Sequence, residues 1–345
     1  MNEELSYAKA GVDIDVTDAA KRQMSKSIDV GDPRVLNQMG AFASLLEGKF
    51  EGIDHPILVF KTEEPGSKQK LAFDLGCLPS IAYDLVNHLI NDVMVMGAKP
   101  LYMQDCIVCG EINPDIVTEL VANMASACQE QGCTLVGGET SVQPGVLPKG
   151  VYILSASAIG VVDKDRIIDG SAIAEGDIVL GIPSNGLHTN GYTLVRKILE
   201  RNPELKTWPV DGTTFLDVIM RPHTCYYQVA RGLFQSRSLK GLSHITGGGI
   251  QDNLNRILPS SLDAAINLPA LRVPEVFKII REAGKVSDPD VLRTFNMGVG
   301  LAVVCSPSEK EQVISHFSAQ GCAAYPIGEI VRGSGKVCFQ GSLNW

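Results

Sequence analysis

Apolar segments alternate along the chain with segments in which apolar residues recur at helical spacing, and this pattern is typical of proteins that combine helices with strands. Short apolar runs predict strands at residues 57–60, 135–136, 151–162, 178–182, 242–246 and 299–304. Periodic segments predict helices over residues 80–97, 115–131 and 250–258, and another that begins at residues 188–191. The pattern therefore predicts an α/β protein of mixed (α+β) character.

The predicted helix over residues 80–97 has two unlike faces. Ser80 is the expected N-cap and Gly97 the C-terminal stop, and one face is apolar. The opposite face carries a dense set of short polar side chains, namely Asp84, Asn87, His88, Asn91 and Asp92. A solvated helix face usually favours Lys and Glu, because Asp and Asn are poorer helix formers. We therefore expect this polar face to be functional, with a solvated surface as the alternative.

Glycines follow an expected strand in two places. The run 135–136 leads into Gly137, Gly138, Glu139 and Thr140, and an acidic residue behind two glycines suits binding of a metal or a phosphate. The run 242–246 leads through Thr246 into Gly247, Gly248 and Gly249 and then into a helix. Glycines allow a ligand close to the backbone, and the start of a helix offers free N–H groups to an anion. The triple glycine therefore predicts a phosphate site, with a tight turn as the alternative.

Acidic and basic side chains in the first half suit phosphoryl chemistry. Carboxylates occur at Glu63, Glu64, Asp84, Asp92 and Glu139. Such a set could hold Mg-ATP, because Mg²⁺ prefers oxygen ligands and commonly bridges phosphates to one or two carboxylates. Lys68 adds a cation able to meet charge on a transferring phosphoryl group. Each of these residues taken alone is more often an ordinary surface charge.

Two histidines, His188 and His244, lie beside glycine-containing loops. This position makes them better candidates for proton transfer or substrate contact than the remaining histidines. The alternative is a hydrogen-bonding role without proton transfer.

Length and composition indicate a folded protein of about two domains. The chain has 345 residues, and a polar, glycine-bearing stretch at 163–176 suggests a boundary near Gly170. We therefore expect domains at residues 1–170 and 171–345. The formal net charge of -9 makes nucleic acid an unsuitable partner. Because the acidic N-terminus does not resemble a secretion signal and no apolar run is long enough to span a bilayer, we expect a cytoplasmic protein with no membrane partner.

Sequence motifs exclude several common sites. The chain has no GxxxxGK[ST], no GxGxxG that opens a helix, and no HExxH, so P-loop, Rossmann and zincin sites have no support. The nine cysteines indicate free thiols in a reducing compartment. Cys106 and Cys109 form a CxxC, but no second pair completes four zinc ligands, and we expect no metal there.

Taken together, these segments resemble the phosphoribosylformylglycinamidine cyclo-ligase (aminoimidazole ribonucleotide synthetase) family in order, over nearly the whole chain. The resemblance rests on residues 6–7 with 11–15, 91–92 with 97–100, 137–140, 168–170, 188–192 (His-Thr-Asn-Gly-Tyr) with 194–197, 244–249 (His-Ile-Thr-Gly-Gly-Gly) and 294–300 (Thr-Phe-Asn-Met-Gly-Val-Gly).

One segment departs from the family. Where the family has Gly-Thr-Asp-Gly-Val-Gly-Thr-Lys, residues 61–68 read Lys-Thr-Glu-Glu-Pro-Gly-Ser-Lys. A carboxylate at Glu63, a hydroxyl at Ser67 and the lysine at position 68 are retained in kind. Two glycines are lost and Pro65 has no N–H, which puts backbone contacts to phosphate in doubt.

The resemblance implies a two-domain protomer whose N-terminal domain binds ATP and metal and carries a mixed sheet that pairs into a β-barrel in a homodimer. The C-terminal α/β domain would bind the substrate phosphate. It also implies an ATP-dependent ligase of purine biosynthesis that forms a C–N bond, converting formylglycinamidine ribonucleotide to aminoimidazole ribonucleotide through an iminophosphate. Mg²⁺ is the implied cofactor, and a monovalent cation is possible.

The resemblance assigns roles by position. It implies metal binding by Glu63, Asp92 and Glu139, and catalysis or substrate contact by Lys68, His188 and Asn190. The other implied positions are Thr62, Ser67, Asn91, Gly137 and Gly138 for the nucleotide, and Thr246, Gly247, Gly248 and Gly249 for the substrate phosphate.

Two kinds of alternative remain. One is another ATP-dependent enzyme of the same superfamily, such as a selenophosphate synthetase or a thiamine-phosphate kinase. The other is a regulatory protein that binds nucleotide without turnover, an idea motivated by the altered segment 61–68.

Overall fold

The computed structural model describes residues 11, 13–28, 31–37 and 43–345. They form two compact units, one of residues up to Val93 together with Pro100–Val161, and one of Met94–Lys99 together with Val162–Trp345. Ser6, Tyr7 and Val12, which belong to the first resemblance segment, lie outside the described residues. The predicted division at residue 170 into two functional domains stays a prediction.

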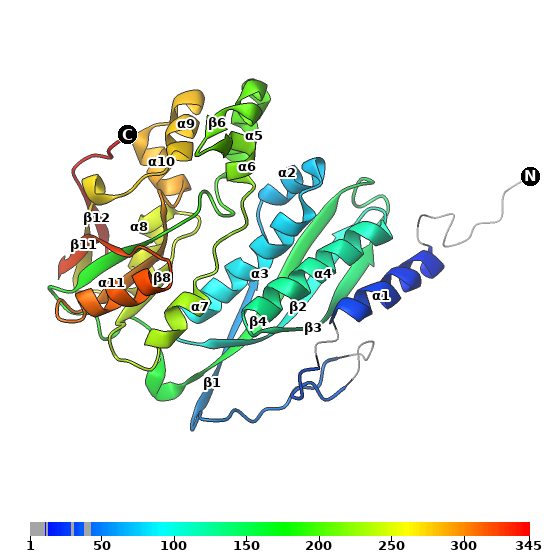
Figure 1. The fold of residues 1–345 in the computed structure, drawn as a ribbon, viewed down its shortest axis with the longest axis horizontal. Coiled ribbons are helices and arrows are strands. Elements are labelled where there is room, and N and C mark those ends of the chain that lie inside the picture. Colours follow the sequence, from blue (N-terminus) through cyan, green and yellow to red (C-terminus); the bar gives the residue numbers. More distant parts are fainter. Residues whose placement is uncertain (1–10, 12, 29–30, 38–42) are drawn as a thin grey trace, which may run out of the picture. The chain divides into compact units, whose positions relative to one another are not determined.

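The first unit is a four-stranded sheet with helices (Figure 1). Its strands run in the order β1-β4-β2-β3. Their bounds are β1 Pro56–Glu63, β2 Lys99–Cys109, β3 Thr134–Val142 and β4 Tyr152–Asp163, and the helices are α1 Ile14–Ile28, α2 Lys68–Leu75, α3 Leu78–Met94 and α4 Pro114–Glu130. Strands β2 and β3 are parallel, and α4 connects them and packs against α1. Parallel strands need such a crossover connection.

The second unit is built on a six-stranded sheet of order β12-β9-β11-β5-β10-β8. The strands are β5 Ile178–Pro183, β8 Gly241–His244, β9 Leu262–Asn267, β10 Val299–Cys305, β11 Tyr325–Arg332 and β12 Val337–Gln340, with a separate ribbon of β6 Pro209–Val210 and β7 Thr213–Thr214. β12 is parallel to β9, and the other pairings recorded within this sheet are antiparallel. Both large sheets therefore belong to a mixed α/β protein, as predicted.

The second unit also contains seven helices of four to ten residues. They are α5 Tyr192–Arg201, α6 Phe215–Ile219, α7 Tyr227–Ala230, α8 Gly249–Leu254, α9 Glu275–Gly284, α10 Asp288–Thr294 and α11 Lys310–Ala319. Single 3₁₀ turns lie at η1 Lys164–Arg166, η2 Pro203–Thr207, η3 Arg231–Leu233, η4 Asn255–Ile257 and η5 Leu268–Ala270.

Most predicted elements are present, because their patterns match their burial. Every residue of β10 is buried, and the strand lies between β5 and β8, which accounts for its unbroken apolar run. Helix α4 starts where predicted, because the Asn113 side chain accepts from the N–H groups of Asp115 and Ile116, and Pro114 occupies the first turn.

Three local predictions are wrong. Helix α3 begins at Leu78, so Ser80 lies inside it and is not its N-cap. Residues 137–140 lie within β3 and do not follow its end, because they pair in register with β2. Helix α8 ends at Leu254 and continues only as the 3₁₀ turn η4, so it is shorter than the predicted 250–258.

Among the described residues, no helix combines the length and the apolarity needed to cross a bilayer.

Segment Met94–Lys99 joins the second unit, where the N–H of Ile168 donates to the carbonyl of Met96 at 3.2 Å. A methyl group at Gly97 would lie 2.9 Å from the carbonyl oxygen of Arg166. Two resemblance segments, 97–100 and 168–170, therefore meet here.

Candidate functional site

Two predicted metal ligands of the first unit lie together around a lysine. Glu63 ends β1 and Asp92 lies near the end of α3, and the Lys61 ammonium is 3.1 Å from a carboxylate oxygen of each. His88 lies one turn before Asp92, with its Nε2 atom 3.8 Å from Asp92 and 3.9 Å from Glu63. Burial lowers the pKa of Lys61, but Asp92 and Glu63 raise it by more, so the net shift is upward. Lys61 therefore stays charged and offsets both carboxylates.

Lys68 and Asp84 form a second ion pair, in the interior. The ammonium of Lys68, the first residue of α2, lies 2.7 Å from a carboxylate oxygen of Asp84 on α3, and neither side chain has any exposed surface. Burial lowers the pKa of Lys68, and Asp84 opposes that shift. The polar face of α3 is therefore partly interior, because Asp84 and Asn91 are fully buried.

The loop before Lys68 is held by side chains. The carboxylate of Glu64 accepts from the Gly66 N–H at 2.9 Å and from the Gln69 side-chain amide at 3.1 Å. Ser67 is the N-cap residue of α2 but makes no side-chain cap hydrogen bond. On β1, the Thr62 hydroxyl pairs with the Ser157 hydroxyl of β4 at 2.8 Å. Glu64 thus has a structural role in the altered segment.

An acidic group that the sequence analysis missed lies on β2. Asp105 is 6% exposed, and burial together with the nearby charge of Glu139 raises its pKa to about 7. It pairs in register with Gly138, where a methyl group would lie 2.2 Å from the Asp105 Oδ1 atom. Any side chain at position 138 would collide with the Asp105 carboxyl group, so this position requires glycine. An aspartate beside Gln104 in a mostly apolar strand was the available sequence signal.

The structure thus brings two pairs of predicted residues of the first unit together, Glu63 with Asp92 and Lys68 with Asp84. The charge of the predicted Glu139 is felt by Asp105, which was not predicted. The predicted joint metal binding by Glu63, Asp92 and Glu139 stays a prediction.

In the second unit, distant motif segments converge. The Asn296 side chain accepts from the Ser184 hydroxyl at 3.0 Å and donates to the Gly186 carbonyl at 2.9 Å. His188 packs against Gly300, where a methyl group would lie 2.7 Å from the His188 Cε1 atom. The loop after β5 is therefore fixed by residues of the segment 294–300.

The triple-glycine loop is held by Asn253. Its side-chain amide donates to the Gly247 carbonyl at 3.1 Å and to the Gly249 carbonyl at 2.8 Å, and its Oδ1 atom accepts from Thr246 at 3.1 Å. Asn190 lies beside Gly247, since a methyl group there would be 3.2 Å from the Asn190 Oδ1 atom. Two predicted substrate-contacting segments therefore meet.

Packing accounts for two of the three glycines. A methyl group at Gly249 would lie 2.0 Å from the carbonyl oxygen of Leu292, and one at Gly248 would lie 2.4 Å from the Asp252 Cβ atom. The Asp252 carboxylate beside Gly248 opposes an anion at that point. Gly247, next to Asn190, is the position best suited to face a phosphate.

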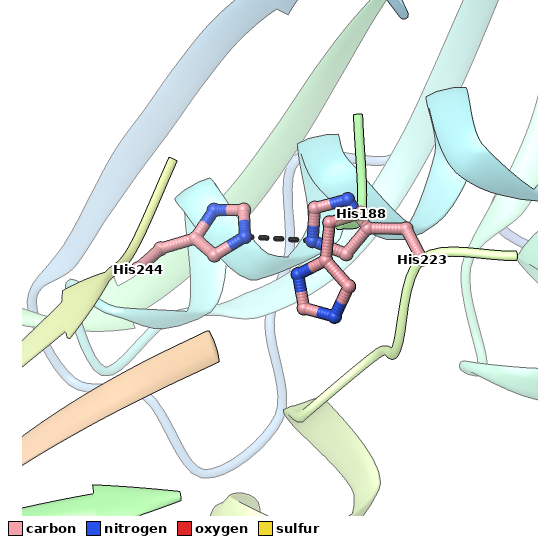
Figure 2. Close-up of side chains that lie close together, drawn as sticks. All are labelled: His188, His223 and His244. Carbon is pink, nitrogen blue, oxygen red and sulfur yellow. Dashed lines mark hydrogen bonds between the residues drawn. The ribbon is translucent and has the colours of Figure 1, made fainter. Parts of the chain in front are cut away.

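Three histidines form a compact cluster (Figure 2). His223 and His244 are joined by a 2.8 Å hydrogen bond between their Nε2 atoms, and the rings of His188 and His223 stack with centroids 3.9 Å apart. All three are buried. The sequence analysis singled out His188 and His244 because they lie beside glycine-containing loops, and it ranked His223, which does not, below them.

Cys106 and Cys109 do not form a two-cysteine site. Both lie on β2 at a spacing of three, and alternate residues of a strand point to opposite faces. All nine cysteines are free thiols.

Comparisons with known proteins agree over both units. Residues 54–162 match the N-terminal domain and residues 174–339 the C-terminal domain of the AIR synthase related protein family. The chain is 40% identical to phosphoribosylformylglycinamidine cyclo-ligase of Methylobacillus flagellatus over 350 aligned positions, which cover 97% of this chain and 98% of the relative.

Solved structures share the fold at lower identity. Escherichia coli HypE is 18% identical with a TM-score of 0.68, covering 94% of each chain. The hydrogenase maturation protein HypE in complex with ATP is 19% identical with a TM-score of 0.66, covering 92% of this chain and 88% of that one. The 40% identity to the cyclo-ligase is about twice the identity to these solved structures. The comparisons therefore do not favour the alternative enzymes of the same superfamily. By its near-complete alignment with that relative, the chain belongs to the phosphoribosylformylglycinamidine cyclo-ligase family.

Proposed function

We propose that this chain catalyses ATP-dependent ring closure of formylglycinamidine ribonucleotide to aminoimidazole ribonucleotide, with release of ADP and phosphate, in purine biosynthesis. The observation that carries the proposal is the 40% identity to a curated cyclo-ligase over 97% of the chain. The convergence of segments 188–192, 244–249 and 294–300 within the second unit supports it.

The chemistry has two steps. The formyl oxygen of the substrate attacks the γ-phosphorus of ATP, ADP leaves, the formamide nitrogen loses its proton, and an iminophosphate forms. The amidine nitrogen then attacks the activated carbon, the C–O bond breaks, phosphate leaves and the nitrogen loses a proton. Because the nucleophile and the electrophile belong to one molecule, holding them in the reactive orientation supplies much of the rate acceleration.

In the second unit, His188 and Asn190 would contact the substrate or the departing phosphate. Thr246 and Gly247–Gly249 would hold the ribose 5′-phosphate, with Gly247 as the closest contact for the packing reasons given above. Helix α8 has only six residues, so its dipole adds little and backbone N–H groups would provide most of the binding.

In the first unit, Thr62, Ser67, Asn91, Gly137 and Gly138 would line the nucleotide site. Lys68 could stabilise phosphoryl charge directly only if its buried ion pair with Asp84 opened. In the described arrangement Lys68 instead ties the altered loop to α3.

Neither pair of carboxyl groups fits Mg²⁺ as it stands. Glu63 and Asp92 already share the Lys61 ammonium. Asp105 pairs with Gly138 and Glu139 pairs with Cys106, so the Asp105 and Glu139 side chains point to opposite faces of the sheet. The Lys61 ammonium would have to leave Glu63 and Asp92 before Mg²⁺ could bind there and offset the charge of the nucleotide phosphates. A monovalent cation is a further candidate cofactor.

The proposal includes a cytoplasmic homodimer whose first units pair into a β-barrel. Nine free thiols support a reducing compartment.

The test is a direct assay of the purified chain with formylglycinamidine ribonucleotide, ATP and Mg²⁺. We expect aminoimidazole ribonucleotide and ADP in equal amounts, and a loss of about 10²-fold or more in kcat/KM for Asn190→Ala. The exposed variant Lys149→Ala is the control and should keep wild-type activity. If the chain binds nucleotide but forms no product, the regulatory alternative is favoured. The observation that supports this alternative is that Lys61 occupies two predicted metal ligands, Glu63 and Asp92.

A further inference from the structure

We propose that His188, His223 and His244 form a binding site for a divalent transition-metal ion such as Zn²⁺ within the second unit. The three side chains come from separate parts of the chain: the loop before α5, the loop between α6 and α7, and the last residue of β8. One ring nitrogen of each lies within 4.8 Å of the others, and Figure 2 shows the three rings gathered at one place.

The distances between the ring nitrogens, from 2.8 Å up to 4.8 Å, lie on either side of the distance in a tetrahedral zinc site. Zn²⁺ binds imidazole nitrogen at about 2.0–2.1 Å, which puts two nitrogens of one site roughly 3.3–3.4 Å apart. The Nε2 atoms of His223 and His244 are 2.8 Å apart, so they need to separate only slightly. The rings of His188 and His223 are near parallel, at 22°, and one must turn to direct its nitrogen at a shared ion.

The ligand type selects the class of metal. Imidazole nitrogens suit Zn²⁺, Co²⁺, Ni²⁺ and Cu²⁺, whereas Mg²⁺ prefers oxygen. The exposed fractions are 2% for His188, 1% for His223 and 5% for His244, so the ion would be largely enclosed by protein. Three protein ligands leave one coordination position for water or another molecule.

The backbone holds His188 in an uncommon conformation. Its φ angle is 61°, in the left-handed region, which costs on the order of 1 kcal/mol for a residue with a side chain. Gly300 leaves the space that the His188 ring occupies, and the Tyr226 hydroxyl beside it donates to the Pro183 carbonyl at 2.8 Å. The surrounding structure thus directs His188 toward the other two rings.

Metal binding would have a consequence for turnover. If His188 contacts the substrate, an ion that binds His188 competes with that contact, and Zn²⁺ should inhibit. This consequence rests on the proposed function, but the metal site itself does not.

The test is calorimetric titration of the chelator-treated, full-length chain with ZnSO₄, with Co²⁺ absorption as a second measurement. We expect one tightly bound ion per chain and the visible spectrum of tetrahedral Co²⁺. His223→Gln should weaken binding at least about tenfold. The matched control is His316→Gln, whose ring bonds to the Val229 carbonyl outside the cluster and whose loss should not change binding. Equal binding by wild type and His223→Gln would overturn the proposal.

A measurement on the unmodified chain covers the case in which His223→Gln does not fold. The chain has six histidines, and Zn²⁺ should shift the imidazole ¹⁵N resonances of three of them. Through-bond assignment of the imidazole resonances in the unmodified chain identifies which three respond. If the shifted set excludes any of His188, His223 and His244, the proposal is wrong.

Discussion

At the residue scale, the buried ion pair of Lys68 and Asp84 makes a sharp prediction. Removing one partner leaves an uncompensated charge in the interior, which typically costs about 3–5 kcal/mol. We therefore expect Lys68→Met to lower the free energy of unfolding of the first unit by that order, measured by urea denaturation.

A double variant separates the charge from the packing. Lys68→Met with Asp84→Leu removes both charges, and such replacements are often close to neutral. The double variant should therefore recover most of the lost stability. If the single and double variants are equally destabilised, packing at these positions explains the loss and the charge argument fails.

Asp105 predicts a dependence of stability on pH. Its pKa is about 7 in the folded protein against 3.8 for the unperturbed group, so the folded state binds the extra proton between these values. The contribution of Asp105 to the free energy of unfolding therefore falls as pH rises from about 4 to 7 and is constant above that range. We expect Asp105→Asn to remove this fall.

The measurement is urea unfolding of wild type and Asp105→Asn at pH 5 and pH 8. The stability of the variant relative to wild type should increase by a few kcal/mol at most between the two pH values. Glu139→Gln is a useful control, because losing the neighbouring charge should shift the fall to lower pH. If the difference in free energy of unfolding between Asp105→Asn and wild type is the same at pH 5 and at pH 8, the prediction is wrong.

At the element scale, the pattern of apolar residues identified β1, β4, β5, β10 and α4. Strand β4 and helix α4 bury residues at the period of their own geometry, β5 and β10 are buried almost throughout as unbroken apolar runs, and β1 alternates half-buried with exposed residues. It failed where pairing with another strand decided the outcome. Residues 137–140 look like a turn locally, but β2 supplies a parallel partner and extends β3 through both glycines. No local signal contains that partner.

Strand β1 and helix α3 are joined by Lys61, and this link predicts the gain of a metal site. Lys61→Ala removes the ammonium that lies 3.1 Å from both Glu63 and Asp92 and leaves two carboxylates facing each other. A divalent cation would relieve that repulsion. We therefore expect Lys61→Ala to bind Mn²⁺ at least about tenfold more tightly than wild type, measured by electron paramagnetic resonance.

The matched control for Lys61 is Lys70→Ala. Lys70 also pairs with a carboxylate, Asp74, but on the exposed side of α2. It should leave Mn²⁺ affinity unchanged, and adding Asp92→Asn to Lys61→Ala should abolish the gain. Equal Mn²⁺ binding by Lys61→Ala and wild type would show that Lys61 does not stand where an ion would bind.

At the scale of the whole molecule, the candidate site was predictable where its residues lie in recognisable segments, as with His188, Asn190 and Gly247. Asp105 and His223 stand outside those segments, and only the fold brings them to Glu139 and to His244. Conversely, Gly248 and Gly249 suggested a ligand, whereas contacts with Asp252 and Leu292 account for them. Sequence spacing cannot separate a glycine required by packing from one required by a ligand.

The proposed homodimer can be tested at the edge of the first sheet. Strand β1 is an edge strand, and its Leu58 and Phe60 side chains are 61% and 67% exposed, with Ile153 of the neighbouring strand β4 at 42%. Apolar side chains gathered on an exposed edge mark an interaction surface, and a second copy of this sheet would cover them. Leu58→Lys with Phe60→Lys should therefore yield monomers in sedimentation equilibrium.

Charge alone must be separated from the loss of this surface. Val146 is an apolar residue that is 72% exposed in the loop before β4, so Val146→Lys adds charge elsewhere in the same unit and should sediment as wild type does. A wild-type chain that sediments as a monomer at assay concentrations would remove the dimer from the proposal. A double-lysine variant that stays dimeric would instead move the interface away from β1.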